Sequence, residues 1–349
     1  MKEKKLEIIE KVKISRKNLK DQNIDGKHMP ILLKESLELL DLKLGQIVVD
    51  CTVNRAGHSI EFAKKIGKDG VLICIDLDAD ALKEAKENID KAFEQDEKLG
   101  LDKKSRLEHK PQIHFVCDNF SNLENILFDL KIKKVDVIYA DLGISSQELD
   151  ISGRGFSFMR DEPLLMTFKS NIEQGDLTAK DIVNTWKENS IADIIYSFAD
   201  EKYSRKIAKS IVDNRKRREI ETTFELVKAI KMGVPLFYQN GKTNFATKTF
   251  QALRMATNRE LDSIIGLIKS LKSTLKESGK ACFITFHSTE DRVVKMTTKE
   301  EGLHPLNKKI IEASRQEEVS NPRSRSAKLR AYTLQGKVIN TRKGEGYIK

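Results

Sequence analysis

From Gly45 onward the sequence alternates short, β-branched apolar segments with longer helical ones, and this alternation constrains the fold more than any other feature. Ile47-Val48-Val49, for example, is bounded by Gly45 and Asp50, which is typical of a short buried strand. Strands joined through helices form a parallel sheet, and such a sheet binds ligands at the carboxyl ends of its strands. We predict strands at residues 47–49, 71–75, 113–116 and 135–139, with helices at 59–66 and 79–93.

The alternation stops after Ser146 and resumes near Thr249. Between these points we predict no strand, but helical patterns around Ile182, Ile194 and Ile207. A long helix over 249–276 and strands over 281–286 and 328–334 follow. The sequence therefore predicts an α/β fold in four parts: a basic N-terminal arm (1–27), the first part of the sheet domain (28–149), a helical insertion (150–245), and the second part with a basic C-terminal segment (246–349).

The net charge of +10 is concentrated in three places. Residues 1–20 carry a net charge of +5, and residues 202–218 and 321–349 carry +7 each, so the rest of the chain is net acidic. Basic residues gathered in patches are typical of a protein that binds a polyanion at defined places. A charge run by itself is equally compatible with an ordinary solvated helix surface.

Several classes of protein are disfavoured by the composition. No apolar run approaches the roughly 18–20 residues that a membrane span needs, and the N-terminal Lys2-Glu3-Lys4-Lys5 lacks the apolar core of a signal peptide. The four cysteines are not closely paired, which argues against a disulfide scaffold or a zinc site and is typical of a reducing cytosol. We therefore expect a cytoplasmic protein with no membrane contact and no bound metal.

The loop after the first predicted strand is the first candidate ligand site. It runs from Cys51 to Gly57, directly after Asp50, and Asp76 closes the second strand 26 residues after Asp50. In a doubly wound sheet, an acidic residue at that position accepts both ribose hydroxyls of an adenosine cofactor. The loop is not GxGxxG, which disfavours a nicotinamide-dependent oxidoreductase because a pyrophosphate requires close backbone approach. S-adenosylmethionine has no phosphate and accepts a looser turn.

Residues just past the third predicted strand can complete an adenosine site. Phe120 can pack on the adenine, with Asp118 near its amino group. Taken singly, Phe120 is more simply a core residue, and Asp50 is as readily a turn or capping residue. The ordered set of these side chains at successive strand ends is what favours a cofactor site.

A series of longer motifs runs along the chain. They are His28-Met29-Pro30-Ile31-Leu32-Leu33-Lys34-Glu35, Asp141-Leu142-Gly143-Ile144-Ser145-Ser146, Gly155 to Leu164, Thr249-Phe250-Gln251-Ala252-Leu253-Arg254, Phe286-His287-Ser288-Thr289-Glu290-Asp291-Arg292 and Asn321-Pro322-Arg323-Ser324-Arg325-Ser326. With these motifs in this order over about residues 28–335, the sequence resembles the bacterial small-subunit (16S) ribosomal RNA cytosine-N4 methyltransferase family. The resemblance implies a Rossmann-like, S-adenosylmethionine-dependent methyltransferase sheet, interrupted by a helical insertion, that methylates N4 of a specific cytidine in 16S ribosomal RNA.

The resemblance also implies which residues hold the cofactor. They are Ala56, Gly57, His58, Asp76, Phe120, Asp141 and Glu148. The family has a Gln where Glu148 stands, and Gln147 is one position early. The family's Gly-x-Gly-Gly-His becomes Asn54-Arg55-Ala56-Gly57-His58, and its Asp-Met-Arg-Met becomes Leu165-Met166-Thr167-Phe168. These departures support a second hypothesis, a degenerate relative that docks on the ribosomal subunit without methylating it.

The implied reaction needs hydrogen-bond acceptors at the end of the fourth strand. An exocyclic cytosine amine is a poor nucleophile because its lone pair is delocalised into the ring, so it must be aligned with the methyl group and then lose a proton. We expect Asp141 or His287 to take that proton, although His287 by itself is also compatible with a structural histidine. Methylation at C5 of cytosine would instead need a cysteine nucleophile. All four cysteines lie in or at the ends of predicted strands, which disfavours methylation at C5.

The basic patches are the predicted RNA contacts. The residues expected to bind phosphates are Arg215, Lys216, Arg217, Arg218, Arg323 and Arg325. The expected partner is 16S ribosomal RNA, either free or in the assembled 30S subunit, and the sequence leaves the oligomeric state open. A base is reached at least cost where it is already unpaired, which favours a single-stranded or loop target.

Overall fold

A computed structural model describes residues 30–98, 110–145, 149, 152–307 and 309–335. Within these residues, five strands of one sheet run parallel: β1 (Ile47–Asp50), β2 (Val71–Asp76), β3 (Gln112–Cys117), β4 (Val135–Asp141) and β5 (Leu275–Thr285). Three more strands extend the sheet in antiparallel pairing: β8 (Lys328–Thr333), β6 (His304–Pro305) and β7 (Ile311–Glu312). The strands predicted from the sequence are therefore confirmed, with β5 beginning six residues earlier than predicted.

The order of the strands is β3-β2-β1-β4-β5-β8-β6, with β7 also paired to β8. The sheet reverses its direction of growth at β1, because β2 and β3 follow on one side of it and β4 and β5 on the other. Such a switch point leaves a crevice at the carboxyl ends of the two central strands. The mixed α/β sheet with this order confirms the predicted Rossmann-like fold class.

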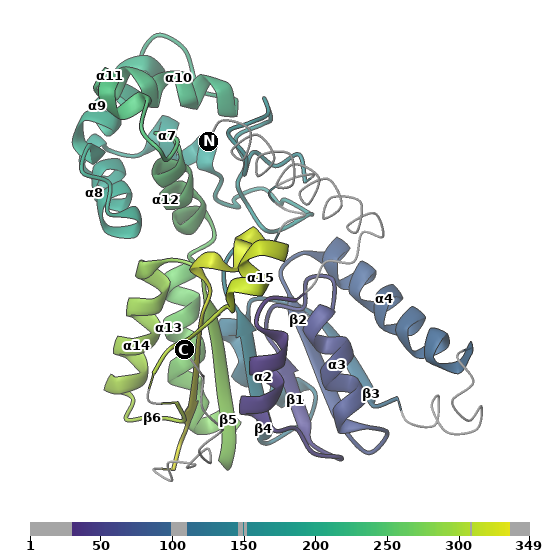
Figure 1. Ribbon diagram of the computed structural model, residues 1–349. Coiled ribbons are helices and arrows are strands. Elements are labelled where there is room, and N and C mark those ends of the chain that lie inside the picture. Colours follow the sequence, from purple (N-terminus) through teal and green to yellow (C-terminus); the bar gives the residue numbers. More distant parts are fainter. Residues whose placement is uncertain (1–29, 99–109, 146–148, 150–151, 308, 336–349) are drawn as a thin grey trace, which may run out of the picture.

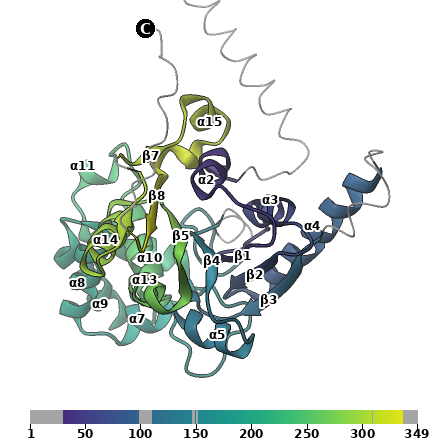
Figure 2. The ribbon, with the colours of Figure 1, turned by 90° about the horizontal axis from the view of Figure 1, so that it is seen from below.

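Helices cover both faces of this sheet (Figures 1 and 2). On one face lie α2 (Leu33–Leu40), α3 (Gly57–Ile66) and α4 (Ala79–Lys98), and on the other α5 (Leu123–Asp129), α13 (Glu260–Thr274) and α14 (Ser288–Glu300). Fully buried side chains such as Phe62 and Leu267 fill the two resulting layers. No helix among the described residues is long and apolar enough to cross a membrane.

A second, all-helical unit lies beyond the carboxyl ends of the strands (Figure 1). Its helices are α7 (Ala179–Thr185), α8 (Glu188–Ala199), α9 (Ser204–Arg215), α10 (Thr223–Gly233), α11 (Leu236–Gln239) and α12 (Thr247–Thr257). They share a core separate from that of the sheet, with Ile182, Ile207 and Leu253 fully buried in it. The helical patterns predicted around Ile182, Ile194 and Ile207 are thus confirmed as α7, α8 and α9.

The helix predicted over residues 249–276 is wrong, because the chain breaks between α12 and α13. Arg259 takes a left-handed backbone conformation (φ 49°), which ends α12 and redirects the chain. The two helices bury their apolar faces in different cores, α12 in the helical unit and α13 against the sheet. Both α12 and α13 are amphipathic, and neither Gly nor Pro stands between them. The helical spacing of apolar residues therefore continues across the break, and the sequence predicts one helix. The helical core thereby extends to Ala256, beyond residue 245.

Candidate active site

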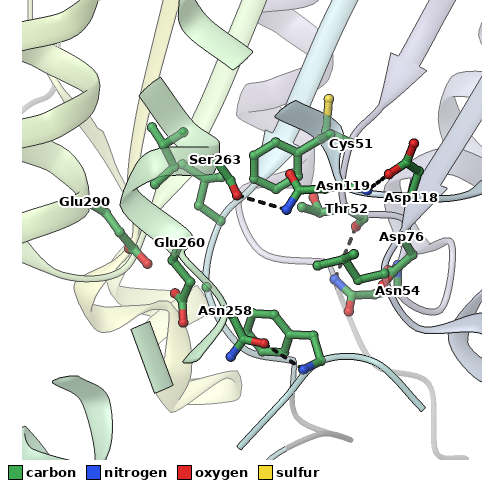
Figure 3. Close-up of a pocket in the computed structure, with 16 residues that line it drawn as sticks. Cys51, Thr52, Asn54, Asp76, Asp118, Asn119, Asn258, Glu260, Ser263 and Glu290 are labelled. Atoms are coloured by element: carbon green, nitrogen blue, oxygen red, sulfur yellow. Dashed lines mark hydrogen bonds between the residues drawn. The ribbon is translucent and has the colours of Figure 1, made fainter. Parts of the chain in front are cut away.

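A cleft opens at the carboxyl ends of the parallel strands (Figure 3). Its walls come from the ends of β1 to β4, from the segment before α7, and from the start of α13 and α14. The residues that line it are Cys51, Thr52, Asn54, Asp76, Leu77, Asp118, Asn119, Phe120, Leu142, Gly143, Phe168, Asn258, Glu260, Ser263, Ile264 and Glu290. This is the edge of the sheet at which the sequence predicted a ligand.

Asp76 lies at this edge as predicted, at the end of β2. One carboxylate oxygen accepts the backbone N–H of Asn54 (3.0 Å) and the other accepts that of Asp78 (3.0 Å). Burial raises the pKa of Asp76 to about 6, despite these two hydrogen bonds and with a contribution from the charge of Asp78. A carboxylate has about four lone-pair sites, so Asp76 retains acceptor capacity toward the cleft.

Asp50, at the end of β1, contacts the loop that follows β1 and the start of α3, and does not line the cleft. It is almost fully buried and accepts hydrogen bonds from Ser59 Oγ (2.6 Å) and from the backbone N–H of Thr52 (3.2 Å). Burial raises the pKa of Asp50 to about 6, even though these bonds favour its charged form. Asp50 therefore fixes the start of α3 beneath the cleft.

Three of the predicted cofactor residues lie behind the cleft instead of lining it. Ala56 precedes α3 with a left-handed backbone (φ 63°) and is fully buried. A Cβ on Gly57 would lie 2.7 Å from Pro30 Cγ, so only glycine allows this approach. His58 Nε2 lies 3.1 Å from the carbonyl oxygen of Ile31 and 2.9 Å from Tyr139 Oη, and burial lowers its pKa to about 4. These contacts and the lowered pKa hold His58 in place as a neutral side chain.

The predicted adenine residues lie together on the cleft wall. Phe120 begins a short 3-10 helix (Phe120–Asn122) after β3 and lines the cleft, while also packing against the core of the sheet. Asp118 lines the same wall, and the amide of Asn119 donates to Ser263 Oγ (2.9 Å), which ties this turn to α13 (Figure 3). Sequence reasoning named Phe120 and Asp118 but missed Asn119 and Ser263.

Asp141 ends β4 next to the cleft. Its backbone N–H donates to Thr52 Oγ1 (2.7 Å), and Oδ1 is buried with no hydrogen-bond partner among the described residues. Burial, together with the charges of Asp50 and Glu290, raises the pKa of Asp141 well above its ordinary value. Leu142 and Gly143, the next two residues, line the cleft. Glu148 lies outside the described residues.

His287 is paired with a carboxylate that the sequence analysis quoted in a motif but did not single out. It caps α14: Nδ1 accepts the backbone N–H of Glu290 (3.3 Å), and Glu290 Oε2 accepts the backbone N–H groups of Phe286 (2.8 Å) and His287 (3.3 Å). The Nε2 atom of His287 lies 2.9 Å from Glu290 Oε1. The spacing of three residues, typical of a capping box, is the signal that would have linked them.

An ion pair joins the two units beside this cap. Arg254 of α12 binds Glu260 of α13 through both carboxylate oxygens (2.7 and 2.8 Å), and its Nη2 lies 3.9 Å from Glu290 Oε1. Burial raises the pKa of Glu260, although the charge of Arg254 opposes this. Figure 3 shows Glu260 and Glu290 beside each other on the cleft wall. The sequence analysis missed Glu260 because it placed the residue inside one continuous helix.

The segment that departs from the family pattern forms the outer wall of the cleft. Phe168 lines the cleft, its backbone N–H donates to Asn258 Oδ1 (2.8 Å), and the Asn258 amide donates to the carbonyl of Met166 (2.7 Å). The guanidinium of Arg154 reaches both the carbonyl oxygen of Phe168 (2.6 Å) and the carboxylate of Asp78 (2.7 Å). Leu165 to Phe168 are thus fixed against the end of β2 without the acidic and basic side chains that the family has there.

The predicted RNA residues differ in their surroundings. The guanidinium of Arg215 donates to the carbonyl oxygens of Val183 (2.8 Å) and Trp186 (2.7 Å), so it holds the end of α7. Lys216, Arg217 and Arg218 are exposed after α9; Lys216 pairs with Asp213 (3.0 Å) and Arg218 with Glu225 (3.6 Å). In the second patch, the 3-10 helix Pro322–Ser326 carries Arg325 exposed and Arg323 half-buried.

The fold and this cleft define the class of protein, a Rossmann-like α/β protein with a helical insertion and a ligand site at the switch point of its sheet. Its site fits S-adenosylmethionine, because Asp76 keeps free acceptor sites at the cleft and the buried Oδ1 of Asp141 has no partner among the described residues, as expected where a ligand supplies one. The MraW methylase family model matches residues 25–334, and the chain belongs to that family. S-adenosylmethionine is its methyl donor, as the sequence predicted.

Relatives match over almost their whole length. The chain is 39% identical over 327 residues, 88% of this chain and 98% of the relative, to ribosomal RNA small subunit methyltransferase H of Finegoldia magna. It is 37% identical over 322 residues (87% and 97%) to the protein of the same name from Clostridioides difficile. Among solved structures, a chain described as a putative rRNA-methylase from Clostridium thermocellum covers 88% of this chain and 99% of its own, with a TM-score of 0.38 and 11% identity. That distant likeness has no part in the assignment.

Proposed function

We propose that this chain transfers a methyl group from S-adenosylmethionine to the exocyclic N4 of a cytidine in small-subunit ribosomal RNA. The observation that carries the proposal is the near full-length similarity to relatives named for the small-subunit ribosomal RNA. A cleft at the switch point of the sheet, lined by apolar and by several polar side chains, supports it, since ligands of such folds bind there. The choice of cytidine N4 comes from the sequence motifs.

The cleft residues divide between the two substrates. Asp76 is proposed to accept the ribose hydroxyls of the methyl donor, and Phe120 to pack on its adenine with Asp118 near the adenine amino group. When bound, S-adenosylmethionine supplies an electrophilic methyl group on a positively charged sulfur. Its positive charges also favour the ionised forms of the carboxylates around the cleft, whose pKa values burial has raised.

Asp141 is the proposed acceptor for the amine of the base. It ends β4 next to the cleft, and its Oδ1 has no hydrogen-bond partner among the described residues. A carboxylate with a raised pKa is also a better proton acceptor than an ordinary one. His287 suits this task less well, because both of its ring nitrogens face Glu290.

The RNA is proposed to bind the exposed side chains of Lys216, Arg217, Arg218 and Arg325, and the half-buried side chain of Arg323. The first three follow α9 in the helical unit, and the other two lie in the 3-10 helix Pro322–Ser326. A cytoplasmic location and the assembled 30S subunit as partner are parts of this proposal. Glu148, Ala56, Gly57 and His58 remain predicted cofactor residues.

A methyl-transfer assay tests the function directly. The purified chain is incubated with radiolabelled S-adenosylmethionine and either 30S subunits or free 16S ribosomal RNA from a strain that lacks the gene, and the nucleosides are then separated by mass spectrometry. We expect label in N4-methylcytidine. Label in C5-methylcytidine, or in no nucleoside of either RNA while calorimetry shows cofactor binding, would contradict the proposal. The docking hypothesis expects binding to 30S subunits but no detectable binding of S-adenosylmethionine.

A further inference from the structure

Glu290 is a completely buried carboxylate that the proposed function does not use. Its oxygens contact two backbone N–H groups, His287 Nε2 (2.9 Å) and, at 3.9 Å, Arg254 Nη2. Burial by itself raises the pKa of a carboxyl group, but the contact with the His287 ring, the charge of Arg254 and the backbone N–H of Phe286 outweigh it. The pKa of Glu290 therefore lies below its ordinary value. Glu290 is ionised at neutral pH although it has no exposed surface.

Gly143 brings this charge close to the end of β4. Its backbone has φ +109°, which favours glycine, and a Cβ there would lie 3.6 Å from Glu290 Oε1 and 3.3 Å from Phe286 Cδ2. Both Gly143 and Glu290 line the cleft. The negative charge thus lies directly behind the turn at which the amine of the base is proposed to bind. In a site screened from water, a fixed charge acts far more strongly than it does in solution.

Three polar groups of His287 contact Glu290, two of them at its carboxylate. Its Nδ1 accepts the N–H of Glu290, its backbone N–H donates to Glu290 Oε2, and its Nε2 lies next to Oε1. In the neutral ring, acceptance at Nδ1 requires the proton on Nε2, which lies 2.9 Å from Glu290 Oε1 without the alignment of a hydrogen bond. His287 cannot take a proton at Nδ1 without giving up the cap of α14.

We infer that Glu290 is a fixed negative charge that stabilises the positive charge developing on the methyl-accepting amine, and that His287 is a positioning residue for Glu290 instead of a base. This inference rests on the proposed function. In the reaction the amine lone pair forms the new N–C bond, the electron pair of the breaking C–S bond stays on sulfur, and the amine nitrogen becomes cationic until its proton passes to Asp141. Positive charge therefore moves toward Glu290 as the methyl group is transferred.

The variant Glu290→Gln tests the charge alone, because glutamine keeps the size of the side chain and an oxygen for the two backbone N–H groups. We expect the single-turnover rate of methyl transfer at saturating substrates to fall by about 10²-fold. The Kd values of S-adenosylmethionine and of S-adenosylhomocysteine, measured by calorimetry, should change far less. The limb of the pH–rate profile that reports Asp141 should move to lower pH, because a nearby negative charge is lost while Asp50, Tyr139 and Cys282 still face Asp141.

Glu225→Gln is the matched control, since Glu225 closes the same kind of capping box in α10, away from the cleft. Its single-turnover rate should equal that of the unsubstituted chain. An unsubstituted chain that transfers no methyl group would contradict the proposed function. If that chain is active and Glu290→Gln keeps its rate and pH profile, only the role of Glu290 is overturned. Weaker binding of S-adenosylmethionine but not of S-adenosylhomocysteine, with an unchanged rate, would also overturn it.

His287→Asn separates positioning from proton transfer. Asparagine is a favourable N-cap and can accept the Glu290 N–H, but it cannot serve as a base. We expect His287→Asn to keep most of the rate that His287→Ala loses, with the pH profile retained. Equal losses in both variants, together with disappearance of a titrating limb, would identify His287 as the base and overturn its positioning role.

Discussion

The α/β unit and the helical unit, α7 to α12, differ in how they hold ionisable side chains. At the strand ends of the α/β unit, Asp50 and Glu290 are buried and contacted by hydroxyl, imidazole or backbone groups. On the helical unit, Lys216 and Arg217 project into solvent. A buried charge acts strongly on a few neighbours, whereas exposed charges act weakly, additively and in a salt-dependent way. The first arrangement suits chemistry at one atom, and the second suits binding of a long polyanion.

The ion pair between the two units offers the largest test of this difference. Arg254→Met leaves Glu260 and Glu290 buried without their shared cation, and we expect a loss of about 3–5 kcal/mol in the free energy of unfolding. Urea denaturation measures it. As a control, Lys272→Gln removes a partly exposed pair with Glu301 (3.0 Å) and should cost less than about 1 kcal/mol. Equal losses for the two variants would show that burial does not distinguish the pairs.

The second test uses pH. Because burial raises the pKa of Asp50 to about 6, the folded state binds a proton more tightly than the unfolded chain does. The resulting stabilisation is complete below the unfolded pKa and is lost as pH rises to about 6. Relative to Asp50→Asn, the unsubstituted chain should therefore lose about 2 kcal/mol between pH 4 and pH 7. Chemical denaturation at several pH values measures this difference.

Ser59→Ala tests the contribution that opposes burial, because the Ser59 hydroxyl lowers the pKa of Asp50. Its hydroxyl donates to Asp50 (2.6 Å) and favours the charged form. Removal of the hydroxyl should therefore destabilise the protein more at pH 7 than at pH 4. A stability difference that does not change with pH in either variant would mean that Asp50 keeps an ordinary pKa in the folded protein.

The smallest effects are expected on the helical unit. Substitutions of two nearby arginines, Arg215 and Arg217, should there differ in their effects on stability and on RNA binding. Arg215→Gln loses two hydrogen bonds to backbone carbonyls and should cost about 1–3 kcal/mol of stability. Arg217→Gln changes an exposed side chain and should stay within about 0.5 kcal/mol. Only Arg217→Gln should weaken RNA binding at unchanged stability and reduce the salt slope by about 1. Filter binding at several salt concentrations measures this slope. If Arg217→Gln and the unsubstituted chain had equal salt slopes, Arg217 would not contact the RNA.

Much of the fold could be predicted because it depends on local pattern. Strands β1, β2 and β4 combine β-branched residues with an aspartate at the end, and Asp118 directly follows β3; a parallel sheet must bring those ends together. That rule placed Asp76, Phe120 and Asp141 at or beside one cleft. The break at Arg259 could not be predicted, since the apolar period is the same on both sides of it and only the two separate cores require the turn.

The sequence by itself determined the α/β class, the family and the strand ends at which the cofactor is expected. Only the tertiary structure decided which charged side chains are held by contacts within the protein and which face solvent. Arg215 and Arg217 are two residues apart in one basic run, yet one binds carbonyl groups 29 and 32 residues away and the other faces solvent. Glu290 and Gly143 meet only because α14 begins where β5 ends, beside β4. Burial and charge pairing depend on such long-range contacts, and no local pattern records them.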